Sequence, residues 1–271
     1  MKLVTKPRVE LVGRQVFDIE GVLKFLEEHG IEWPEVQNKF DSNCDLGDRD
    51  AEYIVEMAAR LCYLSFGKKQ SRSHEDHIKH LIRVGHGSCL EHAKFNFCIW
   101  NVSRSLTHEL VRMRIGVAYS QLSQRYVDSS DCAFVVPPAI QELKEKEPVY
   151  YATWVTHMER SRELYSKFTE ALYAMYDNIE NKTERRKKAN QAARSVLPNA
   201  TETKIFVSLN GRSVRHLIEL RSNPAADLEI RQLAVEVYKL MEKNFPLIVY
   251  GMKLIILPDG TEGVESEFKR V

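Results

Sequence analysis

The sequence has few of the features of a disulfide-stabilised, secreted or membrane protein. Its five cysteines in 271 residues are odd in number and never stand in a CxxC spacing, which is typical of a reducing compartment. No run approaches the roughly 20 apolar residues that a membrane helix needs, and residues 1–6 lack the apolar stretch of a signal peptide. We therefore expect a cytoplasmic protein with no membrane partner.

Neither sign of charge dominates the chain. Lys plus Arg number 39 against 38 Asp plus Glu, for a formal net charge of +1. Because a nucleic-acid coat carries a large excess of positive charge, we expect no nucleic-acid partner and predict that any anion site is a local cluster. The basic run at 182–188 is typical of a solvated helix face, and nucleic-acid binding stays an alternative for it.

Apolar periodicity predicts several helices and a few strands that do not alternate regularly. We expect helices at 18–28, 49–64, 74–84, 151–179, 213–220 and 226–243, a short helix after Ser103, and strands at 9–16, 94–100 and 204–209. Residues 31–48 and 114–138 look irregular. This order predicts an α+β fold, with a mixed or antiparallel central sheet flanked by helices. No linker rich in Gly, Pro or Ser divides the chain, so we expect one domain over 1–271, with 1–50 as an N-terminal extension.

The densest polar segment of the chain is 112–126. It holds three arginines, two serines, two glutamines and two tyrosines and contains no carboxylate. An arginine cluster without acids is costly unless an anion binds there, and tyrosine can stack on a flat ring. The segment therefore indicates an anion or nucleotide site, with a surface loop paired to distant acids as the alternative. A weak internal echo between 101–108 and 210–216, each following a strand and opening a helix, fits anion binding or coincidence.

Other chemistries find less support in the residues. His74, His77 and His80 repeat at three, so they drift around a helix, and no Cys or carboxylate completes a tight ligand set; we expect no metal. No GxGxxG follows a strand, which excludes a standard dinucleotide-binding fold. None of the cysteines stands in the setting of an activated nucleophile.

The segment 112–126 resembles the defining motif of flavin-dependent thymidylate synthases, which is Arg-His-Arg followed by seven residues and Ser. Its tail, Ser-Gln-Leu-Ser-Gln-Arg-Tyr, matches a common form of that motif. Two departures occur: Met113 replaces the histidine, and eight residues separate Arg114 from Ser123. The extra residue falls near Gly116, where glycine could absorb a bulge.

The resemblance extends to both sides of this motif. Residues 86–92 are similar to His-Glu-Thr-Pro-Phe-Glu-His of the family, and residues 194–231 resemble its C-terminal half. Similarity covers about 53 to 245. It implies the family's α+β fold, FAD as cofactor, NADPH and 5,10-methylenetetrahydrofolate as co-substrates, and a homotetramer whose sites are shared between subunits.

The resemblance also implies roles for individual residues. Arg221 would be catalytic, because it would stabilise the ionised uracil ring and so polarise C5. The dUMP-binding residues would be Glu109, Arg112, Gln121, Ser123, Gln124, Arg125, Arg194 and Arg221. The FAD-binding residues would be Ser88, Arg112, Met113, Arg114, Gln121, Asn210, Arg212 and His216. His86 and Tyr126 would lie near the folate.

The activity implied by the resemblance is methylation of C5 of dUMP to give dTMP. Two alternatives stay open. The same scaffold could methylate or hydroxymethylate another pyrimidine nucleotide, UMP or dCMP, which Met113 and the inserted residue motivate. The chain could also be a non-catalytic nucleotide- or RNA-binding protein that uses its arginines and the basic run.

Overall fold

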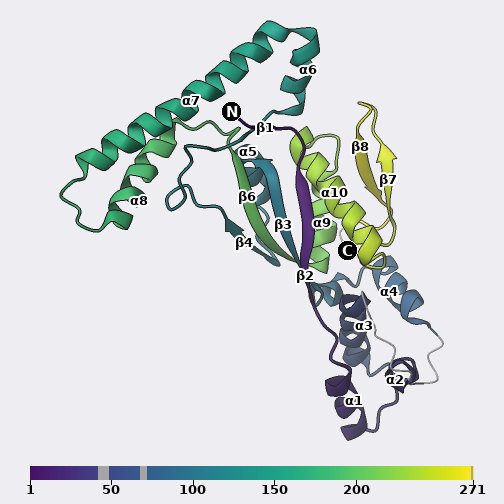
Figure 1. The fold of residues 1–271 in the computed structure, drawn as a ribbon. Coiled ribbons are helices and arrows are strands. Elements are labelled where there is room, and N and C mark those ends of the chain that lie inside the picture. The colour runs from purple at the N-terminus through teal and green to yellow at the C-terminus, as the bar shows by residue number, and fades with distance from the viewer. Residues whose placement is uncertain (42–48, 68–71, 270) are drawn as a thin grey trace. The chain divides into compact units, whose positions relative to one another are not determined.

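The computed structural model describes residues 1–41, 49–67, 72–269 and 271, and it confirms an α+β fold (Figure 1). The helices are α1 (Ile19–Glu28), α2 (Pro34–Asp41), α3 (Asp50–Tyr63), α4 (His74–Arg83), α5 (Arg104–Leu110), α6 (Pro138–Lys146), α7 (Pro148–Met175), α8 (Lys182–Ala193), α9 (Gly211–Arg221) and α10 (Leu228–Asn244), with 3-10 helices η2 (Gly87–Glu91) and η3 (Arg194–Val196). The strands are β1 (Leu3–Val4), β2 (Arg8–Arg14), β3 (Lys94–Ser103), β4 (Val117–Gln121), β5 (Phe134–Val135), β6 (Glu202–Asn210), β7 (Met252–Ile256) and β8 (Glu262–Ser266).

A four-stranded sheet with the order β2-β3-β6-β4 contains the three predicted strands. The backbone bonds from Leu122 N to Lys204 O and from Asn210 N to Gly116 O make β4 antiparallel to β6. Strand β4 lies in a segment that we predicted to be irregular, and that prediction was wrong. Its five residues alternate only between half-buried and exposed positions, so no strong apolar period marks them; pairing with β6 supplies their order.

The chain divides into two compact units. Unit 1 comprises Met1–Val9, Cys98–Met113 and Tyr119–Phe206, and unit 2 comprises Glu10–Phe97, Arg114–Ala118 and Val207–Val271. Each of the four sheet strands contributes residues to both units. The expectation of a single domain stays a prediction.

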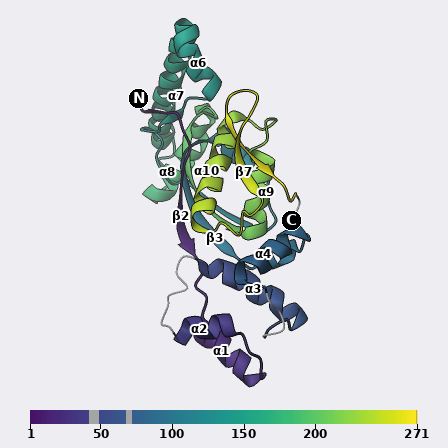
Figure 2. The same cartoon turned by 90° about the vertical axis from the view of Figure 1, so that its right-hand side faces the viewer.

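The core of unit 2 forms where β3 meets the C-terminal helices. Phe95 and Phe97 alternate inward along β3 and are fully buried, and the ring of Phe95 lies 4.7 Å from that of Phe245. Helices α9 and α10 pack together and against the antiparallel hairpin β7–β8 (Figures 1 and 2). The sequence did not predict this hairpin, because the apolar residues of β7 do not alternate, β8 has only one, and the hairpin depends on α10 for burial.

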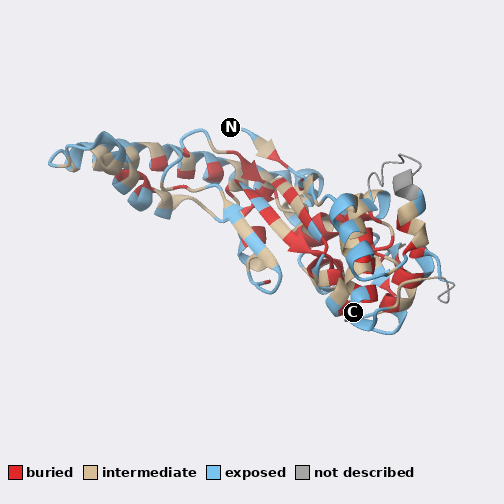
Figure 3. Ribbon diagram, turned by 90° about the horizontal axis from the view of Figure 1, so that it is seen from below, coloured by how far each residue is buried: buried red, intermediate tan, exposed pale blue. Residues whose placement is uncertain are grey.

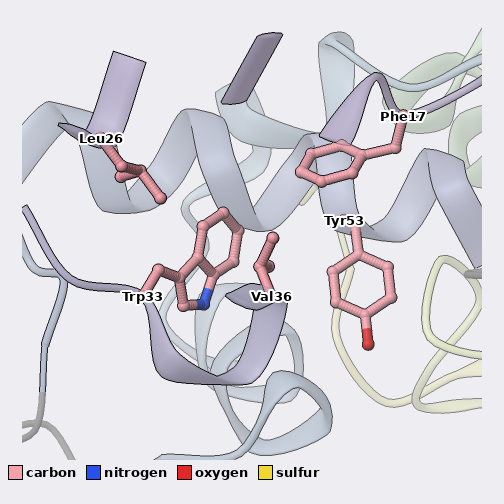
Figure 4. Packing of buried hydrophobic residues seen from close by; sticks show 5 residues of the cluster. All are labelled: Phe17, Leu26, Trp33, Val36 and Tyr53. Atoms are coloured by element: carbon pink, nitrogen blue, oxygen red, sulfur yellow. The ribbon is translucent and has the colours of Figure 1, made fainter. Parts of the chain in front are cut away.

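A second apolar cluster in unit 2 explains helix α2, which falls in a segment that we predicted to be a loop. Trp33 and Val36 are almost fully buried beside Phe17, Leu26 and Tyr53 (Figure 4). The rings of Phe17 and Trp33 meet edge to face at 6.2 Å. Tertiary packing of Trp33 and Val36 thus stabilises a short helix in which polar residues predominate. The rest of the predicted loop, 42–48, lies outside the described residues.

Unit 1 contains the predicted long helix, and it is less covered than its periodicity suggested. Only Met158, Ser161 and Tyr165 of α7 are buried, whereas Leu164 and Phe168 are 41% and 44% exposed (Figure 3). The apolar stripe is therefore not fully buried by unit 1 itself. In the described part of the chain, no helix combines the length and the apolar character needed to cross a membrane.

A buried ionic network joins α3 to α4 in unit 2. Glu52, Glu56 and Arg60 repeat every four residues along α3, and His74 is the first residue of α4. Glu56 accepts hydrogen bonds from Arg60 Nε at 2.6 Å and from His74 Nδ1 at 2.5 Å. The ring of Tyr53 stacks on His74 at 3.9 Å. All four charged side chains are at most 4% exposed, so the network has almost no contact with water.

Both central groups titrate away from their ordinary pKa values. Burial by itself would lower the pKa of His74, but the carboxylates of Glu52 and Glu56 outweigh it and raise the pKa above 6.5. Burial likewise would raise the pKa of Glu56, but His74 and Arg60 lower it below 4.5. Glu52 Oε2 lies 3.9 Å from His74 Nε2, so that contact acts through charge rather than through a hydrogen bond.

The stability that this network contributes should depend on pH in both directions. The contribution of His74 is complete below 6.5 and is lost as the pH rises through its raised pKa. The contribution of Glu56 is complete above 4.5 and is lost as the pH falls through its lowered pKa. Both contributions are therefore complete together only between these two values.

We predict that His74→Gln lowers the free energy of unfolding at mildly acidic pH by about 3–5 kcal/mol, because it takes the cation of His74 away from buried Glu52 and leaves buried Glu56 with Arg60 alone. Urea denaturation over a pH series measures this. The wild type should lose stability as the pH rises above neutrality, and the variant should lack that slope. The control is His157→Gln, at an exposed position on α7. Parallel curves for the wild type and His74→Gln would contradict the assignment.

Candidate functional site

The turn before β4 brings two predicted motifs together in unit 2. Gly116 has a φ of 67°, and a Cβ at this position would lie 2.2 Å from Asn210 Nδ2 and 2.6 Å from Ser213 Oγ. The Oγ of Ser213 donates to Ile115 O at 2.8 Å, and Asn210 Oδ1 accepts from Ser213 N at 2.7 Å. Only glycine fits here, for its conformation and for its size. The structure thus requires glycine at this position, and its role in absorbing the inserted residue stays a prediction.

Arg212 is the second residue of α9 and contacts η2. Its NH1 donates to Glu91 Oε1 at 2.7 Å and its Nε to Val271 O at 3.3 Å. Gly87 lies so close that a Cβ there would be 3.1 Å from Arg212 Nε. Ser88 follows Gly87 and is exposed, as is His86 before it. Unit 2 thus brings η2 and the start of α9 to one place.

A cavity of about 470 Å³ opens at this place. Its lining contains six of the residues described above together with His216, which follows Arg212 by one helical turn. The complete lining is Glu91, Ile115, Asn210, Arg212, Ser213, His216, Glu219 and Val271. A guanidinium, an imidazole, an amide and a hydroxyl surround the cavity together with the carboxylates of Glu91 and Glu219, which suits a polar ligand with both donor and acceptor atoms.

In unit 1, two predicted ligand residues are held by the protein itself. Gln121 Nε2 donates to Thr107 Oγ1 at 3.0 Å and lies 3.3 Å from Thr203 Oγ1. These bonds orient the amide and leave its carbonyl oxygen for another partner. Met113 is only 7% exposed, and its backbone carbonyl accepts from Tyr119 OH at 3.0 Å. Its thioether is mostly a core group.

The residues after Gln121 form a compact turn in unit 1. Arg125 N donates to Ser123 Oγ at 3.3 Å, and Gln124 is buried. The guanidinium of Arg125 lies 5.8 Å from the ring centre of Tyr126, whose side chain is 62% exposed. Arg125 Nε is buried without a hydrogen-bond partner. A cation, an exposed ring and a hydroxyl are therefore adjacent.

A cation that the sequence analysis did not select, Arg104, belongs to unit 1 as well. Burial first, and then the positive charge of Arg194, lower the pKa of Arg104. Two guanidinium groups whose charges repel each other in this way would suit a bound anion. The signal in the sequence was the weak echo between 101–108 and 210–216, which places Arg104 at the start of one helix and Arg212 at the start of another.

The predicted arginines share one property. None of Arg112, Arg114, Arg125 and Arg194 has a carboxylate within 4.0 Å among the described residues. Arg112 and Arg114 are exposed, and the other two are half-buried. The alternative of a surface loop paired with distant acids therefore finds no support in these four side chains.

The remaining predicted residues lie in helices. Arg221 is the last residue of α9 in unit 2 and is half-buried, and Glu109 lies near the end of α5 in unit 1. Both have interactions with other residues of the chain. In the described part of the chain, no three His, Cys, Asp or Glu side chains gather as a group able to hold a metal ion.

Burial disfavours the thiolate form of two of the described cysteines. Burial raises the pKa of the Cys132 thiol to about 11 and also raises the pKa of Cys89. Both thiols are therefore protonated at neutral pH, and a protonated thiol is a weak nucleophile. Cys62, Cys89, Cys98 and Cys132 are all free thiols, and Cys44 lies outside the described residues.

Comparison with known proteins agrees with this arrangement of residues. Residues 46–247 match the family described as thymidylate synthase complementing protein. A flavin-dependent thymidylate synthase of Mycolicibacterium vanbaalenii is 43% identical over 215 residues, which are 79% of this chain and 84% of the relative. The enzyme of the same name from Mycobacterium avium has the same identity and coverage. That of Mycobacteroides abscessus is 43% identical over 211 residues, which are 77% of this chain and 82% of the relative.

The matched region contains the arginine motif, η2 and the start of α9. Because these matches span most of the chain, the protein is an enzyme that belongs to the family of flavin-dependent thymidylate synthases.

Proposed function

We propose that the protein methylates C5 of dUMP to give dTMP. The carbon would come from 5,10-methylenetetrahydrofolate and the reducing equivalents from FADH2, which NADPH regenerates. The observation that carries this proposal is the set of arginines without carboxylate partners in unit 1 and unit 2. All of them lie in the region that matches the family. Guanidinium groups without carboxylate partners are available to bind anions.

The nucleotide is proposed to bind through its phosphate and its base. The mutually repelling pair Arg104 and Arg194 suits the phosphate, because a dianion relieves that repulsion. Ser123, Gln124 and Arg125 would supply the neutral and charged donors of the same site. The other proposed contacts are Glu109, Arg112 and the free carbonyl oxygen of Gln121.

Arg221 is proposed as the catalytic residue. A guanidinium at the N3–C4–O4 edge of uracil stabilises the ionised ring and raises electron density at C5, which then attacks the folate methylene carbon. A fixed cation is suited to this role because it is charged at every physiological pH. The raised pKa values of Cys89 and Cys132 support a reaction without thiolate attack at C6.

The cavity between η2 and α9 fits a flavin. Its volume of about 470 Å³ lies within the range of cofactor sites. Asn210, Arg212 and His216 line it, and Ser88 and Arg114 belong to the same unit. When bound, reduced flavin supplies the hydride that completes the methyl group. The protein's part is to hold the ring and to balance its charge.

The folate is proposed to lie near His86 and Tyr126. The exposed ring of Tyr126 offers a face on which a flat heterocycle can stack, and His86 offers a hydrogen bond. A sister activity on UMP or dCMP, or transfer of a hydroxymethyl group, is the second candidate. The observation in its favour is Met113, a buried thioether where the family motif has histidine.

We also propose that the chain forms homotetramers in the cytoplasm. The exposed apolar stripe of α7, with Leu164, Phe168 and Met175, is a surface that a second copy of the chain could cover. The free thiols of the four described cysteines suit a reducing compartment.

The first prediction tests the proposed catalysis. Arg221→Ala should lower turnover of dUMP to dTMP by about 10²–10³-fold, because one preorganised charge at the reacting ring is lost. Its circular dichroism and oligomeric state should match those of the wild type. Turnover is measured with dUMP, UMP and dCMP in parallel, and Arg160→Ala on α7 is the control. Near-normal turnover in Arg221→Ala would remove this residue from the mechanism. A clear preference of the wild type for UMP or dCMP would show that dUMP is not the substrate.

The second prediction concerns the flavin. Purified protein should be yellow, and Arg212→Ala should weaken FAD binding about tenfold or more, because a hydrogen bond to a charged group contributes about 1.5–3 kcal/mol. A fluorescence titration with FAD measures the Kd. The matched control is Lys253→Ala, which removes an exposed cation of unit 2 that pairs with Glu265 at 3.0 Å. Equal Kd values for Arg212→Ala and the control would place the flavin elsewhere.

The third prediction concerns assembly. Phe168→Glu should shift the protein from tetramers to smaller species in light scattering, because it places a charge in a surface proposed to be buried between subunits. Thr156→Glu puts the same charge on an exposed polar position of the same helix and should leave the mass unchanged. A wild type that is monomeric at assay concentration would refute the proposal.

A further inference from the structure

A small cationic pocket lies in unit 1 where the end of α7 meets the start of α8 (Figure 1). Its volume is about 200 Å³. The lining residues are Arg125, Tyr126, Tyr173, Lys182, Thr183, Arg186 and Lys187. They include four cations, two tyrosine rings and no carboxylate. The basic run that the sequence analysis left open thus forms one wall of a pocket.

The two tyrosine rings hold the cations in place. Arg185 and Arg186 lie 4.3 and 5.6 Å from the ring centre of Tyr173. Lys187 and Arg125 lie 5.3 and 5.8 Å from that of Tyr126. Each such contact orients a cation against the ring face and leaves its other hydrogen-bond donors available. The cations are therefore arranged before any ligand arrives.

Two hydrogen bonds from the side chain of Arg185 to backbone carbonyls also hold the pocket in shape. Arg185 Nε donates to Tyr173 O at 2.5 Å, and its NH2 donates to Ala174 O at 3.2 Å. They tie the start of α8 to the last turn of α7, which is the pair of elements that forms the walls. Arg185 itself is thus a structural residue, and the cations that face the pocket belong to its neighbours.

The charges in the pocket are not neutralised by the protein. Lys182 and Arg186 have no carboxylate within 4.0 Å among the described residues, and Arg125 Nε is buried without a partner. The one ion pair, from Lys187 to Glu184 at 3.1 Å, is exposed to solvent and so contributes little. An oxyanion with several acceptor atoms is the ligand that satisfies such a site.

This pocket is separate from the pair Arg104 and Arg194. Helix α8 runs from Lys182 to Ala193, and Arg194 follows its last residue, so the two cationic centres lie at opposite ends of the helix. At about 1.5 Å per residue the backbone positions of Lys182 and Arg194 are roughly 18 Å apart. One monophosphate cannot contact both ends. Lys182 and Arg186 therefore suit an anionic group of another molecule, whereas Arg125 lines this pocket and is also proposed to contact the nucleotide.

We propose that the α7–α8 pocket binds an oxyanion carried by a co-substrate of the reaction rather than by the nucleotide that is methylated. This rests on the proposed function. Two co-substrates carry such groups: the γ-glutamyl carboxylates of a folate, and the phosphates of a reduced nicotinamide dinucleotide. Arg125 and Tyr126 link the pocket to the turn of Ser123, so an extended co-substrate can reach both. A nucleic-acid strand is disfavoured, because the chain's formal net charge is only +1.

The test uses the full-length FAD-loaded enzyme and the double variant Lys182→Ala/Arg186→Ala. KM is measured for methylenetetrahydrofolate with one and with five glutamyl residues, for NADPH and NADH, and for dUMP. We expect the variant's KM to rise about tenfold, more at low than at high salt, for the co-substrate whose oxyanion uses the pocket. The KM for dUMP should change less than twofold. Lys188→Ala, an exposed cation on the same helix outside the pocket, is the matched control.

The arms identify the source of the oxyanion. If the wild type prefers the folate with five glutamyl residues and the variant loses that preference, the pocket binds the folate tail. If the variant instead loses a preference for NADPH over NADH, the pocket binds the phosphate of the nicotinamide cofactor. Unchanged KM values for both co-substrates, or an equal rise for dUMP, would overturn the proposal. So would a variant altered only in its affinity for a single-stranded RNA.

A binding measurement keeps this proposal distinct from the proposed reaction. Calorimetric titration with inorganic pyrophosphate should show weaker binding in the double variant than in Lys188→Ala, whether or not dTMP is formed. Wild-type enzyme that binds pyrophosphate through this pocket but does not methylate dUMP would reject the reaction and leave the oxyanion site standing. Equal pyrophosphate binding in the wild type and the double variant would reject the site itself.

Discussion

The close approach of Gly116 to Asn210 is the constraint on which the site in unit 2 depends. A side chain at Gly116 would overlap both Asn210 and Ser213, and the left-handed backbone there is favourable only for glycine. The same contact caps α9, since Asn210 accepts from Ser213 N, and it sets the direction of the segment that begins at Arg114. Because a helix N-terminus attracts negative charge, the constraint also defines where an anionic or polar ligand can approach.

The protein has almost no excess of positive charge, and its unpaired cations are concentrated at particular places. The chain is nearly neutral, yet the arginines of the motif have no acidic partners while other cations, such as Arg60 and Arg231, are paired with buried or half-exposed carboxylates. Repulsion between unpaired guanidinium groups costs free energy in the empty protein. Binding of the anionic substrates proposed above would recover that cost.

Helix α8 relates the two cationic centres of unit 1. A helix is a rigid element, so Arg194 at one end of α8 and Lys182 at the other are held at a constant separation. If a flexible loop joined the two cationic centres, both could contact the same anion. A helix keeps them apart, and two different anions can bind at the same time. Arg185 of α8 donates a hydrogen bond to Tyr173 O and lies over the ring of Tyr173, and these contacts fix the angle between α8 and α7.

Most helices and three strands of the sheet could be predicted, because their apolar residues recur at the period of the element. Helix α2 and strand β4 could not. The order of α2 comes from burial of Trp33 and Val36 among residues that precede and follow them in the chain, and that of β4 from hydrogen bonds to β6. Local periodicity carries no information about such partners, so short elements of this kind escape it.

The amino-acid sequence alone determined the family, the arginine motif with its methionine, and the position where glycine would be needed, since each of these is a matter of residue identity and spacing. Only the tertiary structure decided that Arg104 stands beside Arg194, that Arg212 meets η2, that Met113 is buried, and that the basic run lines a pocket. These facts depend on contacts between segments far apart in the chain, and such contacts are set by packing of the whole core.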